Sequence, residues 1–223
     1  MSNSNAVPSP ASHPAARRAL IVIDVQNEYV MGNLPIEYPP LDVSLANIGR
    51  AIDAAHAAGV PVIVVQHLAP AGAPIFAPGS DGVALHAVVA SRPYAHLIGK
   101  TQASSFAGTD LAAWLDTHGI DTLAVAGYMT HNCNAATVYH AAHAGLKVEY
   151  LDDATGALPY ENEAGAASAE EIHRAYTVVF QSNFAAVMST DAWIAGLAGA
   201  PVPVRDSVAA SNRRARAQRA KAA

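Results

Sequence analysis

The single cysteine of this 223-residue chain, Cys133, lies where an apolar run gives way to an alanine-rich helical pattern. Residues 123–127 predict a buried strand that ends in glycine, and residues 134–145 predict a helix. A thiol at the start of a helix faces unpaired N–H groups and the positive end of the helix dipole, so we expect its pKa to lie below the free value of about 8.5. The thiolate is the form of cysteine that attacks carbon, and the pattern therefore indicates a nucleophile.

The turn before this helix can also direct two backbone N–H groups, those of Met129 and Cys133, at one point, as an oxyanion hole requires. A lone cysteine can instead be a small buried hydrophobe without chemistry. The strand–turn–helix position favours the nucleophile, because open α/β sheets bind ligands outside the carboxyl ends of their strands. Rapid alkylation by iodoacetamide at neutral pH would favour an activated thiol over a structural one.

Two charged residues follow other predicted strands. Asp24 follows the apolar run 19–23, and Lys100 comes after the weaker strand 95–98. The carboxyl ends of parallel strands open on one edge of a sheet, so Asp24, Lys100 and Cys133 could meet in one pocket. There the carboxylate could take the thiol proton, while the ammonium stabilises the carboxylate, the thiolate and a developing oxyanion. The alternatives are a helix or turn cap for the aspartate and a solvated surface position for the lysine.

The elements that must position these side chains alternate along the chain. Strands are predicted at 19–23, 60–65, 95–98, 123–126, 147–151 and 177–180. Helices are predicted at 42–58, 84–90, 109–118, 134–145, 162–175 and 190–197, with Thr109 as the cap of the third. This order predicts an α/β fold, a three-layer doubly wound six-stranded parallel sheet with helices on both faces. The glycine-rich motifs of dinucleotide and nucleoside triphosphate sites do not follow the first strand.

Composition sets limits on the class of protein. With 52% hydrophobic and 14% charged residues, the chain is globular rather than disordered. We expect one domain at 19–204, a disordered N-terminal tail at 1–18, and a basic C-terminal tail at 205–223 that forms a frayed, solvated helix. Between residues 19 and 204 five basic residues face seventeen acidic ones, which excludes nucleic acid as a partner of this part. The apolar runs are too short for a membrane span and the N-terminus lacks the order of a secretory signal, so we expect a cytoplasmic protein without a membrane partner.

Four segments between residues 19 and 193 resemble the isochorismatase-like cysteine hydrolase superfamily, in the same order. They are Leu-Ile-Val-Ile-Asp24-Val-Gln26-Asn27, Lys100-Thr-Gln-Ala-Ser-Ser-Phe106, Gly127-Tyr-Met-Thr130-His-Asn-Cys133-Asn-Ala-Ala-Thr137 and Asp152-Asp153-Ala154. That superfamily includes nicotinamidases, N-carbamoylsarcosine amidase, ureidoacrylate amidohydrolases and streptothricin hydrolase. The resemblance implies a hydrolase domain over 19–204 in which a catalytic triad of Asp24, Lys100 and Cys133 cleaves an amide-type carbon–nitrogen bond of a small molecule through a thioester. It also implies a non-proline cis peptide bond between Tyr128 and Met129, which would direct the Met129 N–H beside that of Cys133.

The resemblance also implies what the protein binds. Metal-dependent nicotinamidases carry an Asp-x-His motif after the second strand, where this chain has Gln66-His67-Leu68, so we expect no metal and no other cofactor. Relatives are commonly dimers or tetramers, and we expect a homodimer or homotetramer. Relatives often have valine where this chain has Asn134, so we expect a different polarity in the pocket. The residues expected to bind substrate are Gln26, Tyr29, His67, Phe106, Tyr128, His131 and Asn132.

Alternatives to these assignments remain open. His131 could serve as the base in place of Asp24. His140 and His143, three residues apart on one helix, could bind zinc rather than lie on an exposed surface. The chain could hydrolyse a vinyl ether, as isochorismatases proper do, although relatives with that activity lack the cysteine. It could also be a non-catalytic assembly protein with a structural cysteine, but three polar strand ends would then have no role.

Overall fold

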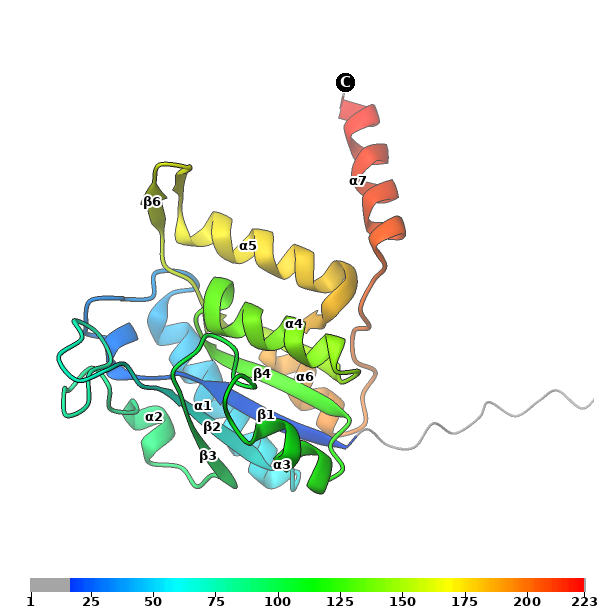
Figure 1. Ribbon diagram of the computed structural model, residues 1–223. Helices are drawn as coiled ribbons and strands as arrows, with labels where there is room; N and C mark the ends of the chain where they lie inside the picture. The colour runs from blue at the N-terminus through cyan, green and yellow to red at the C-terminus, as the bar shows by residue number, and fades with distance from the viewer. Residues whose placement is uncertain (1–16, 223) are drawn as a thin grey trace, which may run out of the picture.

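A six-stranded parallel sheet forms the centre of the protein (Figure 1). The computed structural model describes residues 17–222. Neighbouring strands pair in parallel, in the order β3-β2-β1-β4-β5-β8. The bounds of the strands are β1 Arg18–Ile23, β2 Val62–His67, β3 His96–Lys100, β4 Thr122–Tyr128, β5 Lys147–Gly156 and β8 Ala186–Met188.

Helices cover both faces of the sheet and form an apolar core on each. One face carries α1 (Leu41–Ala57), the short α2 (Ala87–Ala90) and α6 (Thr190–Leu197). The other face carries α3 (Leu111–Thr117), α4 (Ala135–His143) and α5 (Ala169–Val179).

Strand β1 contributes to both cores. Leu20 and Val22 join the core under α1, whereas Ile21 and Ile23 join the core under α4, and all four are fully buried. A central parallel strand covered on both faces requires such an uninterrupted apolar run. The predicted three-layer α/β fold is therefore confirmed.

The sixth strand of the sheet does not lie where the sequence predicted it. Residues 177–180 belong to α5 and to the π-helical turn η3 (Phe180–Phe184), and the strand is β8 instead. The β-branched residues of this run favoured a strand, but a capping box between Ser168 and Glu171 starts a helix upstream that continues through it. Val178 and Val179 are exposed on this helix, whereas Phe180 is buried in the core.

A small antiparallel hairpin replaces the beginning of the helix predicted at 162–175. Its strands, β6 (Tyr160–Asn162) and β7 (Gly165–Ala167), form a separate two-stranded sheet. Boundaries elsewhere also differ from the prediction by a few residues. Helix α3 begins at Leu111 with Asp110 rather than Thr109 at its N-cap, and β3 continues through Lys100.

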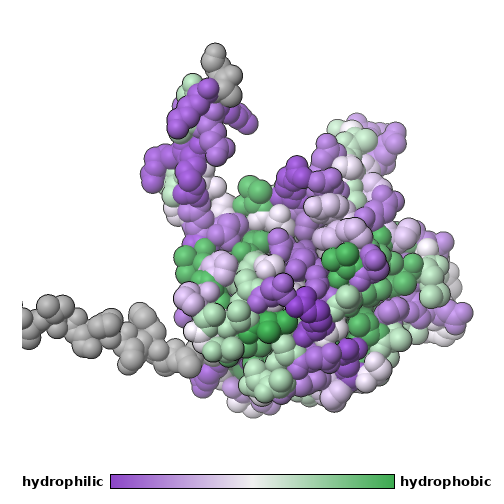
Figure 2. Space-filling model, turned by 180° about the vertical axis from the view of Figure 1, so that it is seen from behind, coloured by the Kyte–Doolittle hydropathy of each residue, from purple (hydrophilic) through white to green (hydrophobic). Residues whose placement is uncertain are grey.

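The C-terminal segment forms helix α7 (Val208–Ala222), which projects from the body of the protein (Figure 1) and is strongly hydrophilic (Figure 2). A solvated helix was predicted for this tail. The disordered tail predicted at 1–18 lies outside the described residues as far as residue 16, and Arg18 already belongs to β1. Among the helices described, none is long and apolar enough to cross a membrane.

The Asp152-Asp153-Ala154 segment lies in an irregular part of β5, where the pairing with β4 shifts. The Asp153 carboxylate accepts hydrogen bonds from the backbone N–H of Thr190 at 2.7 Å and from its hydroxyl at 2.6 Å. Thr190 is the first residue of α6. This segment therefore has a structural role, because it holds the start of that helix.

Gly127, near the end of β4, lies very close to the neighbouring strand. It pairs with Ile23 in the sheet register, and its backbone adopts φ +99. A Cβ atom at this position would lie 2.1 Å from the carbonyl oxygen of Ile23. This close approach places the end of β4 beside the residue that follows β1, Asp24.

We expect Gly127→Ala to lower the free energy of unfolding by about 3 kcal/mol or more, because the added methyl group overlaps backbone and the positive φ is unfavourable. The matched control is Gly145→Ala, where φ is +87 but nothing lies within 4 Å of the added Cβ. The control should cost about 1 kcal/mol. Urea unfolding measures both losses, and equal values would show that the close approach contributes nothing.

Candidate active site

Asp24, Lys100 and Cys133 meet at the carboxyl edge of the sheet. Asp24 directly follows β1, Lys100 is the last residue of β3, and Cys133 lies in the π-helical turn η2 (Thr130–Asn134) after β4. The Nζ atom of Lys100 lies 2.7 Å from Asp24 Oδ2 and donates a hydrogen bond to Cys133 Sγ at 3.2 Å. The side chains of Asp24 and Lys100 are fully buried, and Cys133 is 4% exposed. The structure thus brings together the carboxylate, the ammonium and the thiol.

His67, the last residue of β2, is a fourth member of this cluster. Its Nδ1 atom lies 3.1 Å from Nζ of Lys100. The potential ligand atoms of Asp24, His67 and Cys133 all lie within 4.8 Å of one another, a spacing that could hold a metal ion. The ammonium of Lys100 already contacts all three residues, so a metal ion would have to displace it.

Burial raises the pKa of the Cys133 thiol to about 12. The negative charge of Asp24 acts in the same direction, and the positive charge of Lys100 opposes both. The expectation of a lowered pKa is therefore wrong, because the loss of hydration disfavours the thiolate more than the ammonium of Lys100 stabilises it. A thiol with a raised pKa needs a base before it can attack carbon.

Asp24 has the environment of such a base. Its backbone adopts φ +51, a conformation uncommon outside glycine. Burial raises the pKa of its carboxyl, against the lowering effect of Lys100. Its Oδ1 atom is buried and has no hydrogen-bond partner within residues 17–222, so this oxygen is available to accept a proton.

A buried polar network holds the turn that carries Cys133. The hydroxyl of Thr130 donates to the carbonyl of Gly156 at 3.0 Å and shares a hydrogen bond with the ring of His173 at 2.8 Å. The hydroxyl of Tyr150 donates to Thr130 at 3.2 Å. Because β5 and α5 supply these partners, the turn is tied to both the sheet and the helix layer above it.

Asn134 belongs to the same network. It is fully buried, and its amide donates to the carbonyl of Gly127 at 2.9 Å and to the hydroxyl of Tyr150 at 3.3 Å. Asn134 thus connects the turn to the end of β4. Its effect on the polarity of the pocket stays a prediction.

The peptide bond between Tyr128 and Met129 is cis, as expected. The carbonyl of Met129 accepts hydrogen bonds from the N–H groups of Asn132 and Asn134 at 3.2 Å each. The N–H of Met129, in contrast, donates to none of the described residues. The ring of Tyr128 is buried in the core, where its hydroxyl lies 2.8 Å from that of Ser44.

Tyr29 and Phe106, both expected to bind substrate, are buried, and Tyr29 lies near the cluster. Tyr29 is 2% exposed and packs edge-on against Tyr128, with ring centroids 5.8 Å apart. Burial raises the pKa of Tyr29, and the nearby charges of Cys133 and Asp24 add to this effect. Phe106 belongs to the same apolar core as Cys133.

Gln26 and Asn132, also expected to bind substrate, have different environments. Gln26 is fully buried and bonds to the main chain of His67, where its Oε1 accepts from the N–H at 2.8 Å and its Nε2 donates to the carbonyl at 3.0 Å. Asn132 is exposed. Gln26 thus supports the cluster through His67.

His131, the alternative base, is half-buried in an aromatic environment. Its ring lies edge-on to Tyr160 with centroids 4.7 Å apart, and neither ring nitrogen has a hydrogen-bond partner in the described part of the chain. Burial lowers the pKa of His131 to about 4, which makes it a weak base. Asp24, close to the ammonium and the thiol, is better placed for proton transfer.

The zinc alternative has no support in the geometry. His140 stacks on Phe106 with ring centroids 4.4 Å apart, and His143 packs edge-on against Phe184 at 6.1 Å. Neither histidine belongs to a group of potential metal ligands within residues 17–222.

Tyr160 is a residue near the cluster that the sequence did not reveal, because the short strand β6 has no clear periodic pattern. Its ring packs on His131, and its hydroxyl contacts the sulfur of Met129 at 4.0 Å.

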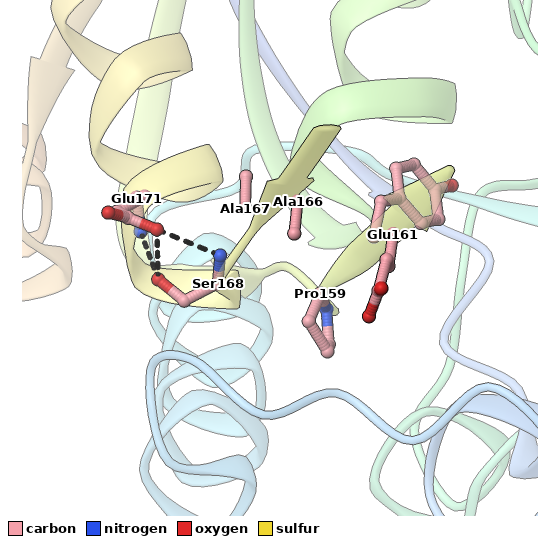
Figure 3. Close-up of a pocket in the computed structure, with 7 residues that line it drawn as sticks. Pro159, Glu161, Ala166, Ala167, Ser168 and Glu171 are labelled. Atoms are coloured by element: carbon pink, nitrogen blue, oxygen red, sulfur yellow. Dashed lines mark hydrogen bonds between the residues drawn. The ribbon is translucent and has the colours of Figure 1, made fainter. Parts of the chain in front are cut away.

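Figure 3 shows a pocket beside the β6–β7 hairpin, in which Ser168 and Glu171 hydrogen-bond to each other and so cap α5. The residues that line it are Pro159, Tyr160, Glu161, Ala166, Ala167, Ser168 and Glu171. Tyr160 therefore connects this pocket with the surroundings of Cys133.

The fold places the chain among the hydrolases of the three-layer α/β class. The chain belongs to the isochorismatase family, because the Isochorismatase domain matches residues 18–192.

Three similar proteins illustrate this relationship. A crystal structure from Burkholderia xenovorans LB400, described as a candidate isochorismatase, has 63% sequence identity and a TM-score of 0.90, and the match covers 92% of this chain and 99% of that chain. The uncharacterised isochorismatase family protein YddQ of Bacillus subtilis (strain 168) is 31% identical over 178 residues, 79% of this chain and 98% of YddQ. The ureidoacrylate amidohydrolase RutB of Methylobacterium radiotolerans is 29% identical over 223 residues, 85% of this chain and 83% of RutB. Relatives in the family thus include an amidohydrolase.

We expect Cys133 to react slowly with iodoacetamide in the folded protein at neutral pH, because its thiol is buried and its pKa is raised. Slow alkylation therefore does not distinguish a structural thiol from a nucleophile that a neighbouring base must deprotonate. The rate should be about 100-fold or more below that of the unfolded chain in urea at the same pH, and it should rise with pH. The chain has one cysteine, so intact-mass spectrometry after timed labelling measures this rate directly. Labelling as fast as in the unfolded chain would contradict the raised pKa.

Proposed function

We propose that this protein hydrolyses an amide-type carbon–nitrogen bond of a small molecule, with Cys133 as the nucleophile. The observation that carries this proposal is one buried ammonium, that of Lys100, 2.7 Å from the Asp24 carboxylate and 3.2 Å from the Cys133 sulfur. A nucleophile, a base and a cation lie together where charge interactions are stronger than in water. The amidohydrolase among the relatives supports the choice of an amide bond.

In the first half of the proposed reaction, Asp24 takes the thiol proton while the sulfur of Cys133 attacks the substrate carbonyl carbon. A sulfur–carbon bond forms, and the carbonyl oxygen becomes an oxyanion. The ammonium of Lys100 stabilises the negative charge as it passes from the carboxylate to the sulfur. Asp24 then gives its proton to the leaving nitrogen, the carbon–nitrogen bond breaks, and a thioester remains.

In the second half, water replaces the sulfur. Asp24, ionised again, takes a proton from the water molecule as its oxygen attacks the thioester carbon. The sulfur–carbon bond breaks, the acid leaves, and the proton held by Asp24 returns to Cys133. One water molecule is consumed for each amide that is converted to an acid and an amine or ammonia.

The backbone N–H groups of Met129 and Cys133 are the proposed donors to the oxyanion. The absence of an acceptor for the Met129 N–H within residues 17–222 supports this role. Tyr29, Phe106 and His131 are the proposed substrate contacts, together with Tyr160 from the hairpin. Their apolar ring faces suit a small organic acyl group better than a highly charged one.

Hydrolysis of a vinyl ether explains less of this site. Such a reaction has no need for a thiol nucleophile, so Cys133 and the proton acceptor beside it would have no role. The Lys100 ammonium supplies the positive charge that a metal ion would bring, and we therefore propose that the reaction needs no cofactor.

Replacement of Cys133 by serine or alanine should lower turnover by about 1000-fold or more, because the nucleophile is lost. The assay is release of ammonia or acid from a panel of primary amides, carbamoyl compounds and lactams. His143→Asn is the matched control, since His143 packs against Phe184 and lies outside the cluster.

The control should retain wild-type turnover. Hydrolysis that survives in the Cys133 variants would contradict its role as nucleophile. A wild-type protein that hydrolyses no member of the panel would count against the amide class.

A further inference from the structure

Lys100 has three hydrogen-bond donors on its ammonium, and the structure gives it three partners. They are Asp24 Oδ2 at 2.7 Å, His67 Nδ1 at 3.1 Å and Cys133 Sγ at 3.2 Å. The side chain of Lys100 is fully buried, so water does not supply a substitute. Asp24 and Cys133 have roles in the proposed reaction, whereas His67 has none so far.

The contact with Lys100 determines which ring nitrogen of His67 carries the proton. An ammonium can only donate, so Nδ1 must present its lone pair and the ring proton must lie on Nε2. Burial, and then the charge of Lys100, lower the pKa of His67, while the charge of Asp24 opposes them. The charged and titratable groups that face this ring are Asp24 after β1, Lys100 on β3 and Cys133 in η2.

His67 is itself held firmly. Both hydrogen-bonding groups of its main chain pair with the buried side chain of Gln26, which also donates to the carbonyl of Val83 at 2.8 Å. Its ring packs edge-on against Phe76, with centroids 5.2 Å apart. The ring nitrogen that faces Lys100 therefore has a defined position.

We propose that His67 is a positioning residue whose neutral Nδ1 holds the ammonium of Lys100 between Asp24 and Cys133. The inference rests on the proposed function for what the ammonium does in catalysis. Without the third acceptor, one N–H of a buried ammonium has no partner, and the group can move away from the sulfur. A displacement of about 1 Å in a catalytic site can cost about 100-fold in turnover.

Nitrogen–proton NMR of the histidine rings tests the hydrogen bond without any substrate. The signals of His67 are those that disappear in His67→Asn. We expect the ring proton on Nε2 and titration below the usual pKa of 6.5. In Lys100→Met we expect the pKa of His67 to rise, because a neighbouring positive charge is removed. A proton on Nδ1 in the wild-type protein, or an unchanged pKa in Lys100→Met, would overturn the proposal.

Steady-state kinetics on an amide found with the panel tests the positioning role. His67→Ala removes the acceptor and should lower kcat by about 100-fold, with KM changed by less than about threefold. His67→Asn keeps an acceptor oxygen near the position of Nδ1 and should recover most of kcat. His143→Asn again serves as the control and should leave both constants unchanged.

Two kinetic results would overturn the proposal. A raised KM with unchanged kcat in His67→Ala would make His67 a substrate contact. No recovery of kcat in a folded His67→Asn would make it a packing residue. Failure of the proposed function looks different: no amide would be hydrolysed, while the NMR spectra would still show whether the hydrogen bond to Lys100 exists.

Discussion

The rest of the site depends on the contact between the buried carboxylate of Asp24 and the buried ammonium of Lys100. Neither side chain is exposed, so both ions have lost their hydration at a cost of several kcal/mol each. Their mutual attraction offsets that cost when the other donors of the ammonium also find acceptors. His67 and Cys133 provide those acceptors, and four residues from four strand ends must therefore keep their positions together.

The strand order explains how residues so far apart in the sequence meet this requirement. Strands β3, β2, β1 and β4 are consecutive neighbours in the sheet. The residue at or after each carboxyl end joins the cluster, namely Lys100, His67, Asp24 and Cys133. Within the sheet the order of strands begins at β1, proceeds outward to β3, and then crosses back to β4 on the other side of β1. Asp24 and Cys133 thus flank the point where the order reverses, which is where open α/β sheets bind ligands.

Much of this frame could be predicted from the sequence, because central parallel strands are long apolar runs and the polar residues after them are conspicuous. The run at 177–180 was wrongly predicted as a strand. Its β-branched residues favour a strand, but the capping box at Ser168 starts a helix that continues through Val179. The direction of the pKa shift of Cys133 was also wrongly predicted, because an argument from the helix dipole does not include the burial of the thiol. Depth of burial, like the orientation of the His67 ring toward Lys100, follows from tertiary packing that spacing along the chain does not reveal.

The β6–β7 hairpin stands apart from the main sheet, and its Tyr160 contacts His131 and Met129 beside Cys133. Most of its remaining residues are exposed. Lengthening, shortening or exchanging this segment would leave the strand ends and their ion pair undisturbed. A lineage could therefore acquire a new range of substrates by altering this one hairpin, while it inherits the proposed catalytic residues unchanged.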